Sequence, residues 1–186
     1  MKSLSGIRFG VVSLIGLVVI ALPLSRLLAD TPASETLIYA VYDGEKTAGQ
    51  VLQTMRKSQK ATGERIESYA VVSKDIGAKV HVRDQRKRDA RVGAVLGGVI
   101  GVLGGPAGAV AGAAAGGSLG YLTGDDVGIS RDTVNQMKSS LTPGTSALIV
   151  VLDNRWVDDV QKGLEQSQAR RVVAEKIANA KPATAK

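Results

Sequence analysis

Residues 36–53 read TLIYAVYDGEKTAGQVLQ, and residues 146–163 read SALIVVLDNRWVDDVQKG. Each stretch opens with an apolar run rich in strand-forming residues, which predicts a buried strand. An Asp and a small turn residue then end the run, and apolar residues at helical spacing follow. The two stretches form a weak internal repeat, and each predicts a strand followed by an amphipathic helix.

The segments around this repeat predict further strands and a helix. Residues 66–73 predict a second strand, and residues 78–83 alternate in polarity with Ala78 on the apolar side. Ser130 is expected to be the N-cap of a helix. Residues 171–174 fit either a helix or an edge strand.

Two strand–helix units with extra strands give an α+β domain with the order βαββαβ, which is the ferredoxin-like plan. In this arrangement the glycine-rich segment at residues 92–124 is an insertion between the third strand and the second main helix. A generic α/β domain of another topology is the alternative. We therefore expect two domain halves at residues 36–91 and 125–180, a linker at residues 30–35, and a disordered tail at residues 181–186.

Residues 1–29 predict a signal peptide or a membrane anchor. Lys2 and Arg8 form a positive region before an apolar run. A cleaved signal has an apolar core of about 7–15 residues, whereas residues 9–28 reach about 20 residues, enough to span a bilayer, although Arg26 interrupts them. Both interpretations stay open, and both direct the chain to a membrane.

The segment at residues 92–124 contains no charged residue and has glycines at every fourth position in two series. On a helix, residues four apart share a face, so each series allows another helix to approach closely. The predicted helix-packing residues are therefore Gly93, Gly97, Gly101 and Gly105 in the first series, and Gly104, Gly108, Gly112, Gly116, Gly120 and Gly124 in the second.

Length predicts that this glycine zipper folds as a helical hairpin. One helix of this length would measure about 50 Å, which exceeds a hydrocarbon core of about 30 Å. Gly104–Gly105–Pro106 is the natural break, because proline cannot continue a helix. We expect a hairpin that is partly inserted in the membrane or stabilised by self-association. The alternatives are a flexible linker and a hairpin that packs in water against the domain or against copies of itself.

A basic run, RDQRKRDAR at residues 83–91, precedes the hairpin. Its predicted contacts with lipid head groups are Arg86, Lys87, Arg88 and Arg91. Such a cluster suits a cytoplasmic face, whereas the amino-terminal charges predict an extracytoplasmic domain at the inner membrane of a bacterium. We favour the second orientation. The run has no interleaved aromatic residues, so no nucleic-acid partner is expected.

The sequence offers little for catalysis. There is no cysteine and one histidine, His81, so thiol chemistry and cysteine-ligated metals are excluded. Residues 116–120 match the hydrolase pattern G-x-S-x-G formally, but Ser118 lies within the glycine series rather than after a strand. No nucleotide-binding or metal-binding motif is present. We expect no enzyme activity, no catalytic residue, no cofactor, no metal and no small-molecule substrate.

Four stretches carry a resemblance to a known family: LIYAVYDGEKTAGQVLQTM, AVVSKDIGAKVHVRD, GAVLGGVIGVLGGPAGAVAGAAAGG and LTPGTSALIVVLD. The chain resembles the bacterial domain of unknown function 1269, predicted membrane proteins with a glycine-rich central segment. The likeness covers most of residues 36–175. It implies a ferredoxin-like scaffold with a membrane-facing hairpin and a strand at residues 171–174, and it supplies no activity. The amino-terminal apolar segment departs from the family pattern.

The leading hypothesis is a membrane-associated protein of structural or regulatory role, related to stress, that forms a homo-oligomer through the hairpin. Membrane lipid and other copies of the chain are its expected partners. A second hypothesis is an oligomeric pore or transport component whose hairpins line a channel. A third is a small-ligand-binding α/β module for which the hairpin is only a tether.

Overall fold

The computed structural model describes residues 35–59, 66–114 and 128–178, and within these ranges it leaves the side chains of residues 59 and 106–114 undescribed. Chain contacts divide the protein into Met1–Thr31 and Pro32–Lys186, and all described residues belong to the second unit. The elements in chain order are β1 Glu35–Asp43, α1 Thr47–Gln59, β2 Ser68–Lys74, β3 Val80–Arg86, α2 Ala90–Ala114, α3 Arg131–Ser140, β4 Thr145–Asp153, the 3₁₀ turn Asn154–Trp156, α4 Val157–Gln166 and β5 Arg171–Lys176.

The described residues form an α+β domain with a five-stranded antiparallel sheet in the order β3-β2-β4-β1-β5. β1 and β2 each pair antiparallel with β4, so they run parallel to each other with β4 between them. In the same way, β4 and β5 run parallel with β1 between them. Helix α1 joins the first parallel pair and α4 joins the second, whereas β3 extends the sheet beyond β2.

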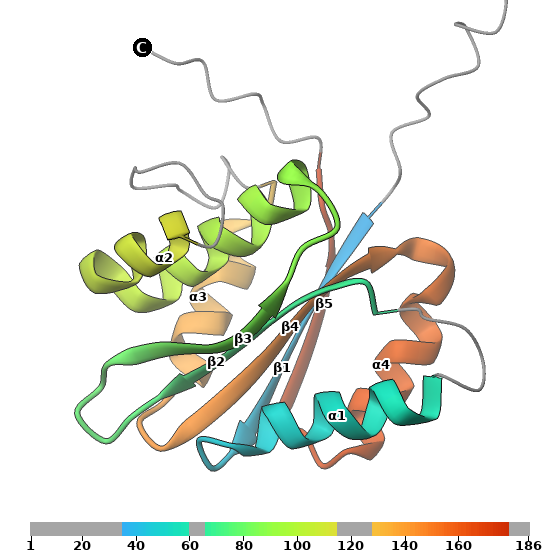
Figure 1. Ribbon diagram of the computed structural model, residues 1–186, viewed down its shortest axis with the longest axis horizontal. Helices are drawn as coiled ribbons and strands as arrows, with labels where there is room; N and C mark the ends of the chain where they lie inside the picture. The colour runs from blue at the N-terminus through green and yellow to red at the C-terminus, as the bar shows by residue number, and fades with distance from the viewer. Residues whose placement is uncertain (1–34, 60–65, 115–127, 179–186) are drawn as a thin grey trace, which may run out of the picture. The chain divides into compact units, whose positions relative to one another are not determined.

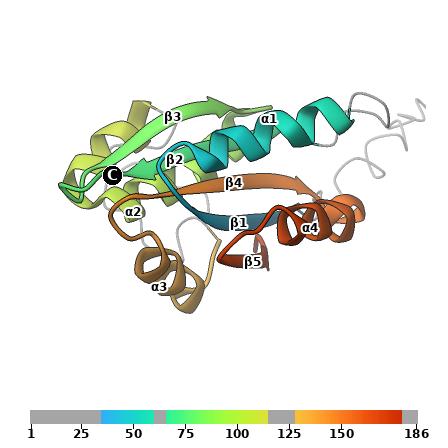
Figure 2. The same ribbon diagram turned by 90° about the horizontal axis from the view of Figure 1, so that it is seen from below.

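Helices cover both faces of the sheet, with α1 and α4 on one face and α2 and α3 on the other (Figures 1 and 2). Alternating residues of β1 enter the two cores: Leu37 and Tyr39 lie on the α2–α3 side, and Ile38 and Ala40 lie on the α1–α4 side. Because the central strands are buried on both faces, their sequences are continuously apolar.

Most of the expected elements are confirmed. The internal repeat forms β1–α1 and β4–α4. Ser130 is the N-cap of α3, because its side chain accepts a hydrogen bond from the backbone N–H of Thr133. Residues 171–174 lie in an edge strand, β5, which pairs with β1. Sequence periodicity therefore located most of the elements, whereas it left residues 171–174 open between helix and strand, and the family resemblance implied the strand.

Two boundary predictions are wrong. Ala78 is a turn residue with a φ of 64° and not part of the strand, because the turn closes through a hydrogen bond from the backbone N–H of Asp75 to the carbonyl of Lys79. Strand β3 instead runs to Arg86, since an edge strand accommodates charged side chains. Glu35 is not in a linker, because it is the first residue of β1 and its side chain is buried.

Candidate functional site

Helix α2 is the part of the glycine-rich segment that the structure describes. Asp89 stands before it, and its Oδ1 accepts a hydrogen bond from the backbone N–H of Val92 at 2.9 Å. This bond lowers the pKa of Asp89, with a further contribution from Arg88. The helix is interrupted at Gly105, where φ is 59° and ψ is −145°. Glycine adopts this backbone conformation without a steric penalty, and the predicted break at Gly104–Gly105–Pro106 is confirmed.

The part of α2 before the break covers the sheet. Its apolar face is buried in the same core as Tyr39, Ala70 and Ile149. Burying such side chains contributes about 1.5–3 kcal/mol each before the entropy cost of ordering them, so this face strongly favours packing on the sheet. This part of the segment is packed against the domain. Packing against the domain is one of the alternatives that the sequence left open. The buried side chains are Val92, Val95, Leu96, Val99, Ile100 and Leu103.

Three glycines of the first series lie on this sheet-packed helix: Gly93 and Gly97 are buried, and Gly101 is half-buried. The fourth, Gly105, is the exposed residue at the break. Gly104, the first member of the second series, faces β3, because a Cβ placed there would lie 3.5 Å from the Cβ of Val80.

The glycines of the second series lie mostly beyond the described side chains. Gly108 and Gly112 are in the helical part after the break, and Gly116, Gly120 and Gly124 lie outside the described residues. Whether the two series pack on each other therefore stays a prediction.

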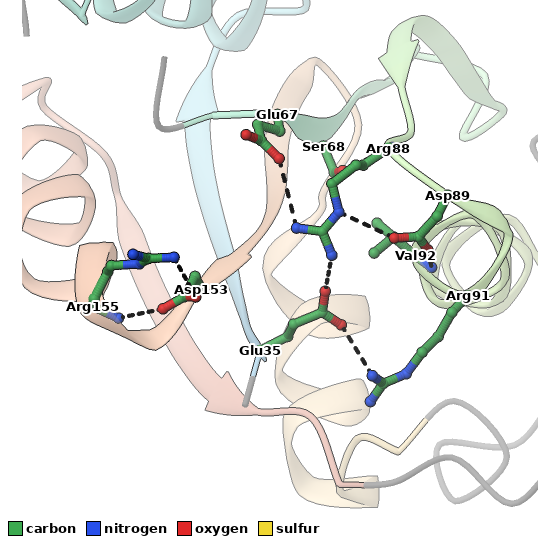
Figure 3. A network of polar contacts seen from close by, with 9 residues as sticks. All are labelled: Glu35, Glu67, Ser68, Arg88, Asp89, Arg91, Val92, Asp153 and Arg155. Carbon is green, nitrogen blue, oxygen red and sulfur yellow. Dashed lines mark hydrogen bonds and ion pairs between the residues drawn. The ribbon is translucent and has the colours of Figure 1, made fainter. Parts of the chain in front are cut away.

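A network of charged side chains ties the start of α2 to the sheet (Figure 3). The guanidinium of Arg88 contacts Glu35 at 2.6 Å, Asp89 at 3.1 Å and Glu67 at 3.6 Å. Arg91 contacts the second oxygen of Glu35 at 3.7 Å. The hydrogen bond to Asp89, followed by the one to Glu35, raises the pKa of Arg88. Because α2 and β1 share these contacts, the network acts as a clamp between them.

Glu35 is the residue at this clamp that sequence reasoning missed. Its side chain is 3% exposed, and its Oε2 accepts no hydrogen bond from the described part of the chain. A buried carboxylate is stable only when cations lie nearby, and Arg88 and Arg91 supply them. Local sequence does not predict this pairing, because Glu35 and its partner Arg88 are 53 residues apart in the chain.

The four predicted lipid-contacting cations fall into two pairs. Arg88 and Arg91 are in ion pairs with Glu35. Arg86 ends β3, where it lies opposite Tyr69, and Lys87 follows it. Both Arg86 and Lys87 are exposed and make no ion pair with another residue in the described ranges. These two cations are the pair that is free to meet an external anion.

His81 lies near the opposite end of β3 and contacts Asp75 at 2.8 Å. The hydrogen bond from His81 is the largest cause of a lowered pKa at Asp75. The pair connects the β2–β3 turn to β3. Within the residues that the structure describes, no cluster of three metal-ligating side chains occurs, and no helix is both long enough and apolar enough to cross a membrane.

Comparison with known proteins identifies one family. The family described as "Protein of unknown function (DUF1269)" matches residues 90–184, about half of the chain. The match begins at the first residue of α2 and extends through α3, β4, α4 and β5. Neither curated proteins nor solved structures give a match. The chain belongs to the DUF1269 family of proteins of unknown function.

Proposed function

We propose that this protein is a membrane-associated, non-enzymatic protein of structural or regulatory role that self-associates through the segment following the break at Gly105. The observation that carries the proposal is the part of the second glycine series that follows the break, Gly108 to Gly124, in a stretch without any charge. The first half of the glycine-rich segment is engaged with the sheet, so the second half is the part left for an external partner.

The cost of glycine supports a packed role for this second half. Each glycine in a helix costs about 1 kcal/mol relative to alanine, so five of them cost about 5 kcal/mol in an isolated helix in water. Close backbone packing against a second helix, in lipid or within an oligomer, offsets that cost. Membrane lipid and another copy of the chain are the partners of this proposal.

Chain geometry also supports lipid contact at one end of the sheet. Glu35 follows the predicted signal peptide or anchor at residues 1–29 by six positions in the sequence. The strand pairing places Arg86, opposite Tyr69, at the same end of the sheet as Glu35. We therefore assign head-group contact to Arg86 and Lys87, and the clamp on Glu35 to Arg88 and Arg91.

The strand pairing further supports a ferredoxin-like fold for the domain. β1–α1–β2 and β4–α4–β5 form two interlocked βαβ units, each split by a strand of the other, which is the ferredoxin-like arrangement. In this proposal β3, α2 and α3 form an insertion between the second and third core strands. Such a fold hosts many functions, so the fold by itself does not indicate a function.

Membrane fractionation with a carbonate wash tests the proposal. The variants are the full chain, a chain without residues 1–29, and a chain in which a Gly–Ser linker of equal length replaces residues 106–124. The linker keeps the chain long enough to connect Gly104 to Gly128. Gly104 lies beside Val80, and the carbonyl of Gly128 accepts a hydrogen bond from the backbone N–H of Ala178. Removing residues 92–105 would instead remove part of the core.

We expect the chain without residues 1–29 to stay partly with the membrane and to form oligomers, and the linker variant to lose its oligomers in cross-linking. If the chain without residues 1–29 is fully soluble and monomeric, the second glycine series neither binds membrane nor self-associates, and the proposal fails. Conductance by the purified oligomer across a bilayer would instead favour the pore hypothesis.

The proposed orientation places the domain outside the cytoplasm of a bacterium, because Lys2 and Arg8 precede the apolar segment. The chain has no cysteine, so a single Ile76→Cys change gives one reactive thiol at a position that is 89% exposed. We expect a maleimide that cannot cross membranes to label this thiol in spheroplasts whose inner membrane is intact. Labelling only after lysis would place the domain in the cytoplasm.

A further inference from the structure

The sheet face that carries α1 and α4 has a hollow of about 630 Å³ beside β3. Small-molecule sites in proteins have volumes of about 300–1,000 Å³, so a compact ligand would fit. The hollow lies on the opposite face of the sheet from α2, so ligand binding there does not depend on the membrane proposal. Its polar lining consists of Glu45 and Lys46 from the turn before α1, Gln50 and Gln53 from α1, and Arg83 and Asp84 from β3.

A β-bulge brings two opposite charges to this hollow. Val72 pairs with Val82 and Val71 pairs with Asp84, so Arg83 is an extra residue without a partner on β2. Neighbouring strand residues normally point to opposite faces, whereas a bulge places two of them on one face. Arg83 and Asp84 both therefore point toward α1.

The contacts of the two side chains confirm this direction and hold them in place. Arg83 donates from Nε to the hydroxyl of Ser73 at 2.7 Å and from Nη2 to Glu45 at 3.1 Å. Asp84 accepts a hydrogen bond from the hydroxyl of Tyr69 at 3.3 Å. A guanidinium has five N–H donors and a carboxylate accepts several hydrogen bonds, so both groups keep capacity for a ligand.

The other lining residues complete a site with balanced charge. Lys46 makes no ion pair with any residue in the described ranges. Gly49 of α1 lies above Val71 of the sheet, where a Cβ would make an ordinary contact at 3.9 Å. Two cations and two carboxylates line the hollow, so a ligand of one sign meets repulsion, while a ligand that carries both signs is matched.

We propose that this hollow binds a small zwitterion of the α-amino acid class. The carboxylate of the ligand is held by Arg83 and Lys46, and its ammonium group is held by Asp84. Arg83 and Asp84 are neighbours on β3 and both line the hollow, so one small ligand can reach both charges. A second hollow, of about 600 Å³ between α1 and α4, has Asp159 as its one charged lining residue and lacks a cation for the carboxylate.

The test is two-dimensional NMR on the full chain in detergent micelles, with each common free L-amino acid added in turn at pH 7. We expect at least one of them to shift the backbone amide signals of Gln50, Arg83 and Asp84 saturably, with a Kd in the micromolar to millimolar range. Arg83→Gln and Asp84→Asn should each weaken binding by about tenfold or more, because each removes a charge-assisted hydrogen bond.

Two controls make the result specific. Lys57→Gln, on α1 outside the hollow, should leave the Kd unchanged within about twofold. Lys46→Gln should weaken binding, and the Lys46 side chain makes no ion pair with the described residues. The α-amide of the bound amino acid lacks the carboxylate, so it should bind more weakly than the acid to the natural protein, and this preference for the acid should be smaller in Arg83→Gln, where Lys46 alone holds the carboxylate. No saturable shift with any amino acid, or an unchanged preference for the acid in Arg83→Gln, would overturn the proposal.

Discussion

The two halves of the glycine-rich segment share one spacing and differ in the residues between the glycines. The half before Gly105 carries Val, Leu and Ile, and its large side chains are buried on the sheet. The half after it is mostly Ala and Gly. Glycines at every fourth position only allow close approach, whereas buried area decides what a helix packs against. A glycine repeat is therefore not a membrane signal by itself.

The largest expected effect comes from shortening a buried side chain of the first half. Ile100→Ala should lower the free energy of unfolding by about 2–5 kcal/mol, because Ile100 is fully buried and its removal leaves a cavity. Ile76→Ala, at a position that is 89% exposed, should change it by no more than about 0.5 kcal/mol. Urea unfolding of the full chain in mild detergent measures both. Equal losses would mean that the first half does not contribute to the core through Ile100.

The next effect concerns the clamp that joins the first half to β1. Glu35→Ala should cost about 1–3 kcal/mol, because it leaves Arg88 and Arg91 without their shared carboxylate while both keep contact with solvent. Glu67→Gln is the control, since Glu67 is half-exposed and 3.6 Å from Arg88, and should cost under about 0.5 kcal/mol. Urea unfolding measures the loss of stability in both variants. If both variants behave alike, the apolar face alone holds α2 in place.

The smallest effects lie at the border between the halves. Gly104→Ala should stabilise the protein by up to about 1 kcal/mol, because its Cβ would make an ordinary contact with Val80. Gly105→Ala should destabilise it by about 1 kcal/mol, because the φ of Gly105 is positive. Opposite shifts in thermal midpoint for these adjacent glycines would confirm that the break is built into the backbone. A gain from both would mean that the helix continues through Gly105.

Local patterns were enough to predict most elements of this fold, although they left β5 open between helix and strand. The apolar runs of β1 and β4, the helical spacing after them, and the N-cap at Ser130 depend on residues within a few positions of one another. The break at Gly105 was predicted for the same reason, since proline and glycine act on the backbone beside them. Ala78 was misplaced because the turn that holds it closes through a hydrogen bond rather than a pattern of polarity.

The sites could not be predicted in the same way. Glu35 looked like a linker residue because its partner Arg88 lies far along the chain. The basic run looked uniform, yet its members separate into a clamp and an exposed pair once β3 and α2 are placed. Arg83 and Asp84 are neighbours that a regular strand would point to opposite faces, and only the pairing of β3 with β2 introduces the bulge that unites them.

The sequence by itself determined the alternation of strands and helices, the charge-free glycine segment with its break, and the family resemblance. Tertiary structure alone decided that the first glycine half belongs to the core, which cations are committed to Glu35, and where opposite charges meet in a hollow. The physical reason is range. Helical and strand periodicity is a property of near neighbours, while burial, ion pairing and strand register depend on residues that only folding brings together.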